Sequence, residues 1–270
     1  MSTDDVLIVE HRGPVDWVTL NRPDRLNALN FALVDAVRTY FEDLRRNRDT
    51  RIVVLRGAGR AFCAGFDMAP DSDVAQSIAQ NRSPNVIWEI QNRFSDICRA
   101  MRRCPQPIIA LMHGAACGGG FSLSLASDIR IAAETAKMNA AYIKIGLTGC
   151  DMGSSYFLPR LVGASMATEI ILTGRFVSAE EALAMRLVSR VVPEAGLAAA
   201  AQPLIDHMLA TAPLGLRMSK EALNLSIDAP SLDAVMAVED RHQALLSHSE
   251  DAREAIDAFL EKRAPVYQDR

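Results

Sequence analysis

The chain has 270 residues, of which 49% are hydrophobic and 23% are charged, and its formal net charge is −4 at pH 7. This composition is typical of a soluble globular protein, and the length allows one large domain plus a smaller appendage. The negative charge argues against sequence-independent nucleic-acid binding, which requires a basic face.

Three features bear on where the protein works. The acidic start, residues 1–5, has no apolar stretch, so we expect no signal peptide. Five cysteines, an odd number without metal-ligand spacing, indicate free thiols in a reducing cytoplasm and no metal site. Residues 104–127 carry no formal charge and are long enough to suggest a membrane helix. Two prolines and a central glycine run divide this segment, so we expect a buried core segment and no membrane insertion.

Strand and helix patterns alternate over the first half of the chain. Segments 6–10 and 15–20 flank a turn and predict an antiparallel pair of strands. Asn30 can cap a helix that runs to about residue 46, with an apolar stripe along one face. Further strands are expected at 52–56, 108–112 and 128–132, and further helices at about 86–102 and from the glycine run at 118–120. This order predicts a layered α/β core with parallel pairing.

The remaining segments predict a flap and a helical tail. Residues 69–84 are polar and interrupted by prolines, which indicates a mobile flap over the loop at 63–68. Residues 178–181 form a capping-box pattern that opens a short helix. From about residue 195 onward the pattern is helical only, and the last helix is expected to begin after Ser249 and to end at Lys262 and Arg263. We therefore divide the chain into an α/β core, 1–195, and a C-terminal helical region, 196–270.

Two glycine-punctuated loops each follow a buried strand pattern. The first is Cys-Ala-Gly-Phe-Asp-Met at 63–68, and the second is His-Gly-Ala-Ala-Cys-Gly-Gly-Gly-Phe at 113–121. Glycine allows a backbone to approach a ligand closely because it has no Cβ. Two such loops could direct two N–H donors at one ligand oxygen, which would form a main-chain oxyanion hole for chemistry that builds negative charge on a carbonyl.

These loops and several other segments resemble the crotonase superfamily, the enoyl-CoA hydratase/isomerase fold. The matching stretches occur in family order at 20–29, 57–68, 114–121, 171–174, 187–193 and 258–265. The resemblance implies a spiral of β-β-α turns followed by a C-terminal helical trimerisation region. It also implies a homotrimer or a dimer of trimers, and an acyl-CoA thioester as substrate. Coenzyme A would then be part of the substrate, and we expect no separate cofactor.

The resemblance assigns the two oxyanion donors to the backbone amides of Phe66 and Gly119. The structural alternative is that both loops are tight turns without a catalytic role. Many family members have alanine where this chain has Phe66, so its aromatic ring is expected to wall the acyl pocket.

The residues that would move protons differ from those of the family's hydratases. Those enzymes use two glutamates, and this chain has Ser122 and Tyr142 at the matching positions. A hydroxyl or a phenol is a poor base near pH 7, so the two residues are expected either to line the pocket or to give polar help. Ser122 is an improbable acyl nucleophile, and His113 is expected to be a core histidine rather than its base.

One carboxylate, Asp151, lies near the second loop in the family register. With one inserted residue, it aligns with the working aspartate of dienoyl-CoA isomerases and of a CoA-thioester dehalogenase. Its neighbours Cys150 and Met152 are apolar, and desolvation by them would raise its pKa and make it a usable acid or base. The alternative role is to cap the helix that is expected to begin near Ser154.

The resemblance also implies contacts with coenzyme A. Arg25 and Leu26 match the stretch that touches pantetheine and phosphates, and Ala64 and Asp67 flank the adenine-side turn. Two further matches fall in the C-terminal helix, where Lys262 would reach a phosphate across a subunit interface and Phe259 would lie beside the adenine. Arg25 and Lys262 could instead be ordinary solvated surface cations.

The leading function is an acyl-CoA-transforming enzyme of fatty acid metabolism that stabilises a thioester enolate, with Asp151 as acid/base. Double-bond isomerisation is favoured because a single base suffices to remove a proton and return it elsewhere. The alternative reaction is hydration by a water held by Tyr142, Ser122 and Asp151. A different class of function is also possible, namely a non-catalytic protein that binds acyl-CoA. The hypothesis of a dinucleotide-binding oxidoreductase has less support, because residues 57–62 have the first two glycines of the G-x-G-x-x-G motif and lack the third.

Overall fold

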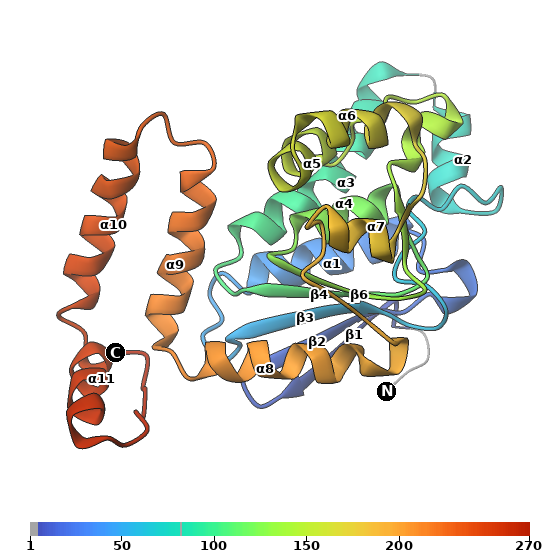
Figure 1. Cartoon of the computed structure of the whole chain (residues 1–270). Helices are drawn as coiled ribbons and strands as arrows, with labels where there is room; N and C mark the ends of the chain where they lie inside the picture. The colour runs from blue at the N-terminus through green and yellow to red at the C-terminus, as the bar shows by residue number, and fades with distance from the viewer. Residues whose placement is uncertain (1–4, 82) are drawn as a thin grey trace.

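The computed structural model describes residues 5–81 and 83–270, and it shows a layered body with a helical arm at its C-terminal end (Figure 1). The acidic start, on which the expectation of no signal peptide depends, lies outside the described residues except for Asp5. Arg82, within the expected flap, also lies outside them.

A six-stranded sheet forms the centre of the body. Its strands, in spatial order, are β1 (Leu7–Arg12), β2 (Val15–Leu20), β3 (Ile52–Gly57), β4 (Ile108–Met112), β6 (Ile129–Ala133) and β9 (Arg190–Val192). The pair β1 and β2 is antiparallel, and every other neighbouring pair is parallel. The expected strands, the antiparallel pair and the parallel core are thus confirmed.

Successive side chains of the central strands enter two different apolar cores, because strand side chains alternate between the faces of a sheet. In β3, Val53 and Leu55 face a core shared with helices α1 (Phe31–Asp43), α3 (Pro84–Arg103) and α4 (Gly119–Ala126). Ile52 and Val54 face the opposite core, which α8 (Leu197–Leu209) covers. Both faces of the sheet are buried, so its central strands read as continuous apolar runs.

A smaller three-stranded sheet and several short helices complete the body. The sheet contains β5 (Ala115–Cys117), β7 (Lys137–Asn139) and β8 (Val177–Ser178). The remaining helices are η1 (Pro23–Arg25), η2 (Ala141–Ile145), α5 (Ser154–Val162), α6 (Ala164–Thr173), α7 (Ala179–Ala184) and η3 (Glu194–Gly196). The sequence pattern did not predict these three strands or β9 of the larger sheet, which are too short to show a strand periodicity.

The predicted helix starts agree with the structure. The side chain of Asn30 accepts a hydrogen bond from the Leu33 amide at the start of α1. Ser178 and Glu181 form both hydrogen bonds of a capping box at the start of α7. Each cap satisfies amides that have no partner within the helix.

The segment 69–84, expected to be a flap, contains a helix that the sequence pattern did not predict, α2 (Asp73–Gln80). The Ser72 side chain caps α2 by accepting from the Ala75 amide, and Val74 is fully buried. The cap and this buried side chain hold α2 against the body, and a helix of only 8 residues gives a short pattern in the sequence.

The chain continues beyond α8 as an arm of three helices, α9 (Pro213–Ser226), α10 (Leu232–Leu246) and α11 (Glu250–Glu261). In Figure 1 the arm extends to one side of the body. The Ser249 side chain caps α11, which ends at Lys262. All regular elements after residue 195 are helices, residues 264–270 have no regular structure, and the predicted start and end of the last helix are confirmed.

Within the described parts of the chain, no helix is both long enough and apolar enough to cross a membrane. The uncharged segment at 104–127 divides into β4, β5 and α4, as expected.

Candidate active site

The first glycine loop is held by an extended segment that precedes α1. The Leu29 amide donates to the Gly65 carbonyl at 2.7 Å, and the Asp67 amide donates to the Leu29 carbonyl at 3.0 Å. These two bonds leave the intervening Phe66 amide unused. Gly65 has φ +97°, and a Cβ there would lie 2.8 Å from the Cys117 carbonyl oxygen, so this close approach requires glycine.

The second glycine loop packs directly against the first. Cys63 pairs with Ala116 in a parallel bridge, and the Cys117 amide donates to the Cys63 carbonyl at 3.0 Å. Gly119 is the first residue of α4, where an amide has no partner within the helix. The position that a Cβ on Gly65 would take lies 3.4 Å from the Gly119 nitrogen, so the two loops are in contact at this point.

The predicted oxyanion donors are thus two amides on adjacent loops. Among the hydrogen bonds formed by the described residues, none uses the amide of Phe66 or Gly119 as a donor. Gly119 also stands at the N-terminal end of α4, where the helix dipole favours negative charge. A ligand oxygen between the loops would therefore meet unpaired donors and a favourable field.

An apolar wall surrounds the Gly119 position. The Phe66 ring lies 4.3 Å from the Phe94 ring and 5.9 Å from the Tyr142 ring, centroid to centroid. A Cβ on Gly119 would meet Leu29, Phe66 and Met152, with the Leu29 Cδ1 atom at 2.8 Å. The space beside the two amides is therefore narrow and bounded by hydrocarbon, aromatic rings and a thioether.

Ser122 and Tyr142 are brought together by α4 and η2. Their hydroxyl oxygens are 2.8 Å apart, and the Ser122 hydroxyl donates to the Asp151 carbonyl at 3.1 Å. Burial, followed by the nearby charge of Asp151, raises the pKa of Tyr142 well above its usual value. The phenol is therefore neutral near pH 7 and can donate a proton to the Ser122 oxygen, but it is a poor base.

Asp151 lies in the turn before α5, beside these hydroxyls. Its Oδ1 atom accepts a hydrogen bond from the Met152 amide at 2.6 Å and another from the Gln91 side chain of α3 at 2.5 Å. Burial raises the pKa of Asp151, and the two hydrogen bonds oppose that shift. Asp151 is thus a half-buried carboxyl whose proton affinity is greater than that of a free aspartate.

The alternative role for Asp151, capping of α5, is not the one its side chain has in the structure. The residue that precedes α5 is Gly153, without a side-chain cap, while the Asp151 carboxylate accepts from Met152. The expected apolar setting is only half right. Met152 is buried, but Cys150 is exposed, so Cys150 does not desolvate Asp151.

His113 lies away from Ser122 and has a structural role. Its Nε2 atom is 2.8 Å from the Gly59 carbonyl oxygen, and the side chain is buried at the end of β4. The expectation of a core histidine is confirmed.

The four body residues predicted to contact coenzyme A lie together at the edge of the first loop. The Ala64 amide donates to the Leu26 carbonyl at 3.0 Å, which joins the two stretches. Arg25 pairs with Asp71 beside α2. Asp67 is buried and pairs with Arg22 at 2.7 Å, so its carboxylate is engaged within the protein.

The two C-terminal residues predicted to contact coenzyme A, Phe259 and Lys262, do not join this group within one chain. They lie at α11, and Figure 1 shows α11 and α2 at opposite ends of the molecule. Phe259 is 81% exposed. A single chain therefore does not bring the two halves of the predicted coenzyme A site together.

The structure adds two residues that the sequence reasoning missed. Gln91 contacts Asp151 from α3, and Phe94, one turn later, supports the Phe66 ring. Phe94 belongs to the apolar stripe of α3, and this pattern is visible in the sequence. The sequence gives no such signal for Gln91, since its partner is 60 positions away.

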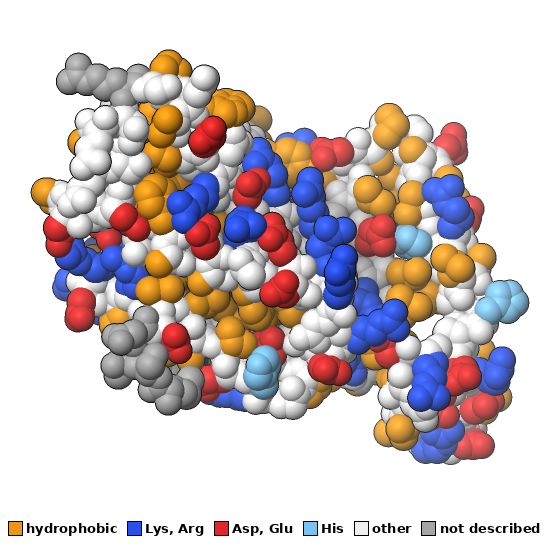
Figure 2. All heavy atoms as spheres, turned by 180° about the vertical axis from the view of Figure 1, so that it is seen from behind, with side chains coloured by type: hydrophobic (Ala, Val, Ile, Leu, Met, Phe, Trp, Pro, Cys, Tyr) orange, Lys and Arg blue, Asp and Glu red, His pale blue; other side chains and the backbone are white. Residues whose placement is uncertain are grey.

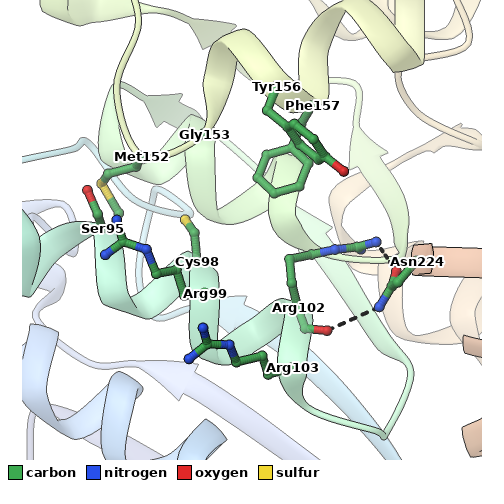
Figure 3. A pocket seen from close by; sticks show the side chains of 10 residues that line it. All are labelled: Ser95, Cys98, Arg99, Arg102, Arg103, Met152, Gly153, Tyr156, Phe157 and Asn224. Atoms are coloured by element: carbon green, nitrogen blue, oxygen red, sulfur yellow. Dashed lines mark hydrogen bonds between the residues drawn. The ribbon is translucent and has the colours of Figure 1, made fainter. Parts of the chain in front are cut away.

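A cavity of about 400 Å³ lies between α3, the turn before α5, α5 itself and α9 (Figure 3). Ser95 and Cys98 of α3 face Met152 and Gly153 across it, and Arg102 joins Asn224 of α9 at its other end. None of the sequence-predicted site residues lines this cavity, but Met152 forms part of its wall and also packs on Gly119.

Known proteins resemble this chain over its whole length. The family model for enoyl-CoA hydratase/isomerase matches residues 10–270. Probable enoyl-CoA hydratase EchA12 of Mycobacterium tuberculosis H37Rv is 38% identical over 270 residues, covering 99% of this chain and 94% of the relative. The 1,2-epoxyphenylacetyl-CoA isomerase of Escherichia coli K12 is 35% identical over 250 residues, covering 93% of each chain.

Solved structures agree with these relatives. The crystal structure of an enoyl-CoA hydratase from Bacillus anthracis matches with a TM-score of 0.90 at 32% identity, covering 98% of this chain and 100% of that one. The family model, the relatives and the fold thus lead to one conclusion. This chain belongs to the enoyl-CoA hydratase/isomerase family, the crotonase superfamily, and is a hydratase/isomerase-type enzyme.

Proposed function

We propose that the enzyme holds the oxygen of an acyl-CoA thioester enolate between the amides of Phe66 and Gly119 while Asp151 moves a proton. The observation that carries this proposal is the pair of unused amides on two touching glycine loops, close to one half-buried carboxyl with a raised pKa. Enolate formation places negative charge on the thioester oxygen, and donors already aimed at that charge lower the barrier.

Within this chemistry we favour isomerisation of a carbon–carbon double bond over hydration. The Ser122 hydroxyl donates its single proton to the Asp151 carbonyl, which leaves the Tyr142 hydroxyl to donate to the Ser122 oxygen. Near pH 7 Ser122 is an alcohol and Tyr142 a neutral phenol, so neither is a base that could take a proton from an attacking water. Asp151 alone can take a proton from one carbon and return it to another. The isomerase name of the Escherichia coli relative is consistent with this choice, and the hydratase names of other relatives support hydration as the second candidate.

The experiment that tests this function is a product-mass assay with a panel of unsaturated acyl-CoA thioesters. We expect at least one thioester to give a product of unchanged mass and different chromatographic mobility, which identifies isomerisation. A product heavier by one water would establish hydration in its place. The absence of product from every thioester would overturn the enzymatic proposal in favour of acyl-CoA binding.

We propose that Arg25, Leu26, Ala64 and the loop stabilised by Asp67 form one side of the coenzyme A site. Phe259 and Lys262 would complete it from α11 of a second copy. The position of α11 at the far end of the molecule supports this arrangement. The proton transfer itself requires no cofactor beyond the coenzyme A carried by the substrate.

The helical arm supports a homo-oligomer, as a trimer or a dimer of trimers. Among the described residues, α10 has no buried side chain although it is 15 residues long. Figure 2 shows apolar side chains on the surface of the arm. The most exposed apolar residues of its three helices are Leu223, Leu232, Leu245, Ile256, Phe259 and Leu260. Helices with so little buried surface need a partner to be stable, so we propose that 196–270 mediates assembly through the part beyond α8.

We expect sedimentation velocity at micromolar concentration to give three or six times the 29.4 kDa of one chain. Leu260→Glu on α11 should shift the protein towards monomer because it places a charge in the apolar contact. The matched control is Leu172→Glu on α6 of the body, since the two leucines are similarly exposed, at 71% and 66%. The control should remain at least trimeric. A monomeric wild type would contradict the proposed assembly.

The proposal also includes the arrangement of the core and the compartment in which the protein works. The order of strands and helices supports the spiral of β-β-α turns that the family resemblance implies. The five cysteines are all free thiols, four of them buried, and this supports a reducing compartment such as the cytoplasm.

A further inference from the structure

The Asp151 carboxylate is restrained at one oxygen only. Oδ1 accepts hydrogen bonds from the Met152 amide and from the Gln91 side chain, whereas no described residue donates to Oδ2. We propose that Gln91 is a positioning residue for the acid/base, which fixes one carboxylate oxygen from α3 and leaves the other to face the substrate. This inference rests on the proposed function of Asp151.

The backbone around Asp151 is fixed independently of Gln91. The Asp151 carbonyl accepts from the Ser122 hydroxyl and from the Ser154 amide, and the Asp151 amide donates to the Ser154 hydroxyl at 3.0 Å. These bonds determine where the residue lies but do not control rotation of its carboxylate. Of the two donors to Oδ1, Met152 belongs to the same turn, so Gln91 is the donor that ties the carboxylate to another element.

A neutral donor suits this position for an electrostatic reason. A cation beside Asp151 would keep the carboxylate ionised and weaken it as a base, whereas an amide donates a hydrogen bond without adding charge. No ion pair involves Asp151 in the described chain. The titratable groups that face it are Tyr142 from η2 and Cys98 from α3. Burial raises the pKa of Tyr142 strongly and that of Cys98 to about 12, so both are neutral near pH 7.

Two substitutions at Gln91 should move the titration of Asp151 in opposite directions. Gln91→Met keeps the length but removes the donor, so the ionised carboxylate loses a hydrogen bond and the Asp151 pKa should rise by about 1. Gln91→Lys places a cation near the carboxylate, so the pKa should fall by about 1 or more. Asn92→Met is the matched control, because Asn92 is the next residue of α3 and donates only to the Trp88 carbonyl.

The pKa of Asp151 can be measured without an activity assay. Carboxyl carbon NMR of protein labelled at the aspartate side chain reports each aspartate, and the signal missing in Asp151→Asn assigns Asp151. The pH profile of kcat is the second measurement. A base must be ionised, so the rising limb of the profile should move to higher pH in Gln91→Met and to lower pH in Gln91→Lys. In Asn92→Met, both measurements should match the wild type.

The outcomes separate this inference from the proposed function. An unchanged Asp151 titration in both folded Gln91 variants would overturn the positioning role, even if Asp151→Asn is inactive. Opposite shifts of the NMR titration would support the contact, even if Asp151→Asn remains active and the proposed function fails. A loss of stability without opposite shifts would show that Gln91 only packs α3 against the turn, which also overturns the proposal.

Discussion

An Asp151→Asn enzyme is expected to turn over its acyl-CoA substrate about 10²–10⁴-fold more slowly than the wild type, the usual effect of losing a general acid–base group. Asparagine keeps the shape of the side chain, and its oxygen can still accept from the Met152 amide and from Gln91. It cannot accept a proton near neutral pH. The loss should therefore appear in kcat, and the affinity for a non-reacting acyl-CoA, measured by calorimetry, should change little.

Ser122→Ala and Tyr142→Phe are the matched controls for this experiment. Both remove a hydroxyl within the same hydrogen-bond chain and leave the carboxylate in place. We expect each to keep most of the wild-type turnover, because the raised pKa of Tyr142 and the alcohol of Ser122 make both poor bases. If these variants lose activity while Asp151→Asn keeps it, the proton moves through the hydroxyls and the role given to Asp151 is wrong.

The second large effect is expected at Gly119. Gly119→Pro removes one of the two proposed oxyanion donors, and a single donor of this kind contributes about 2.7–4 kcal/mol to transition-state stabilisation, or roughly 10²–10³-fold in kcat. Helices in general accept proline at their first position, where the amide has no helical partner, but a Cβ at Gly119 would also meet the Leu29 Cδ1 atom at 2.8 Å. The measurement is steady-state turnover of the same acyl-CoA, together with its binding affinity.

Gly119→Ala separates the lost donor from the added carbon. A Cβ at this position would meet the ends of the Leu29, Phe66 and Met152 side chains in both variants. Alanine retains the N–H group, so the proline variant should be about 10²–10³-fold slower than the alanine variant, at similar affinity for coenzyme A thioesters. Equal turnover in the two variants would remove Gly119 from the oxyanion hole.

The core of the fold could be predicted from the sequence because its signals are local and strong. The strands β3 and β4 are short apolar, β-branched runs, and the Asn30, Ser178 and Ser249 caps precede their helices directly. The helix α2 was missed because it has only 8 residues and buries only Val74. A cap and one anchor side chain are visible only once the body against which the helix packs is known.

The candidate site was predictable where it depends on glycine. The close contact of Gly65 with Cys117 and Gly119 leaves no room for a side chain, so a glycine is required there and is visible in the sequence itself. Contacts between segments that are distant in the sequence have no comparable signal in the sequence. The Gln91–Asp151 hydrogen bond, the Arg22–Asp67 pair and the exposure of Cys150 all depend on how helices and loops pack. Sequence neighbours gave Asp151 an apolar setting, whereas the structure desolvates it through packing with α3 and η2.

The most direct test of the central claim is the product-mass assay applied to the wild type and to Asp151→Asn side by side. We expect the wild type to convert an unsaturated acyl-CoA into an isomer of the same mass, and Asp151→Asn to form the same isomer about 10²–10⁴-fold more slowly. Equal rates of product formation by the two proteins would contradict the account, because the thioester enolate would then form without the carboxylate of Asp151.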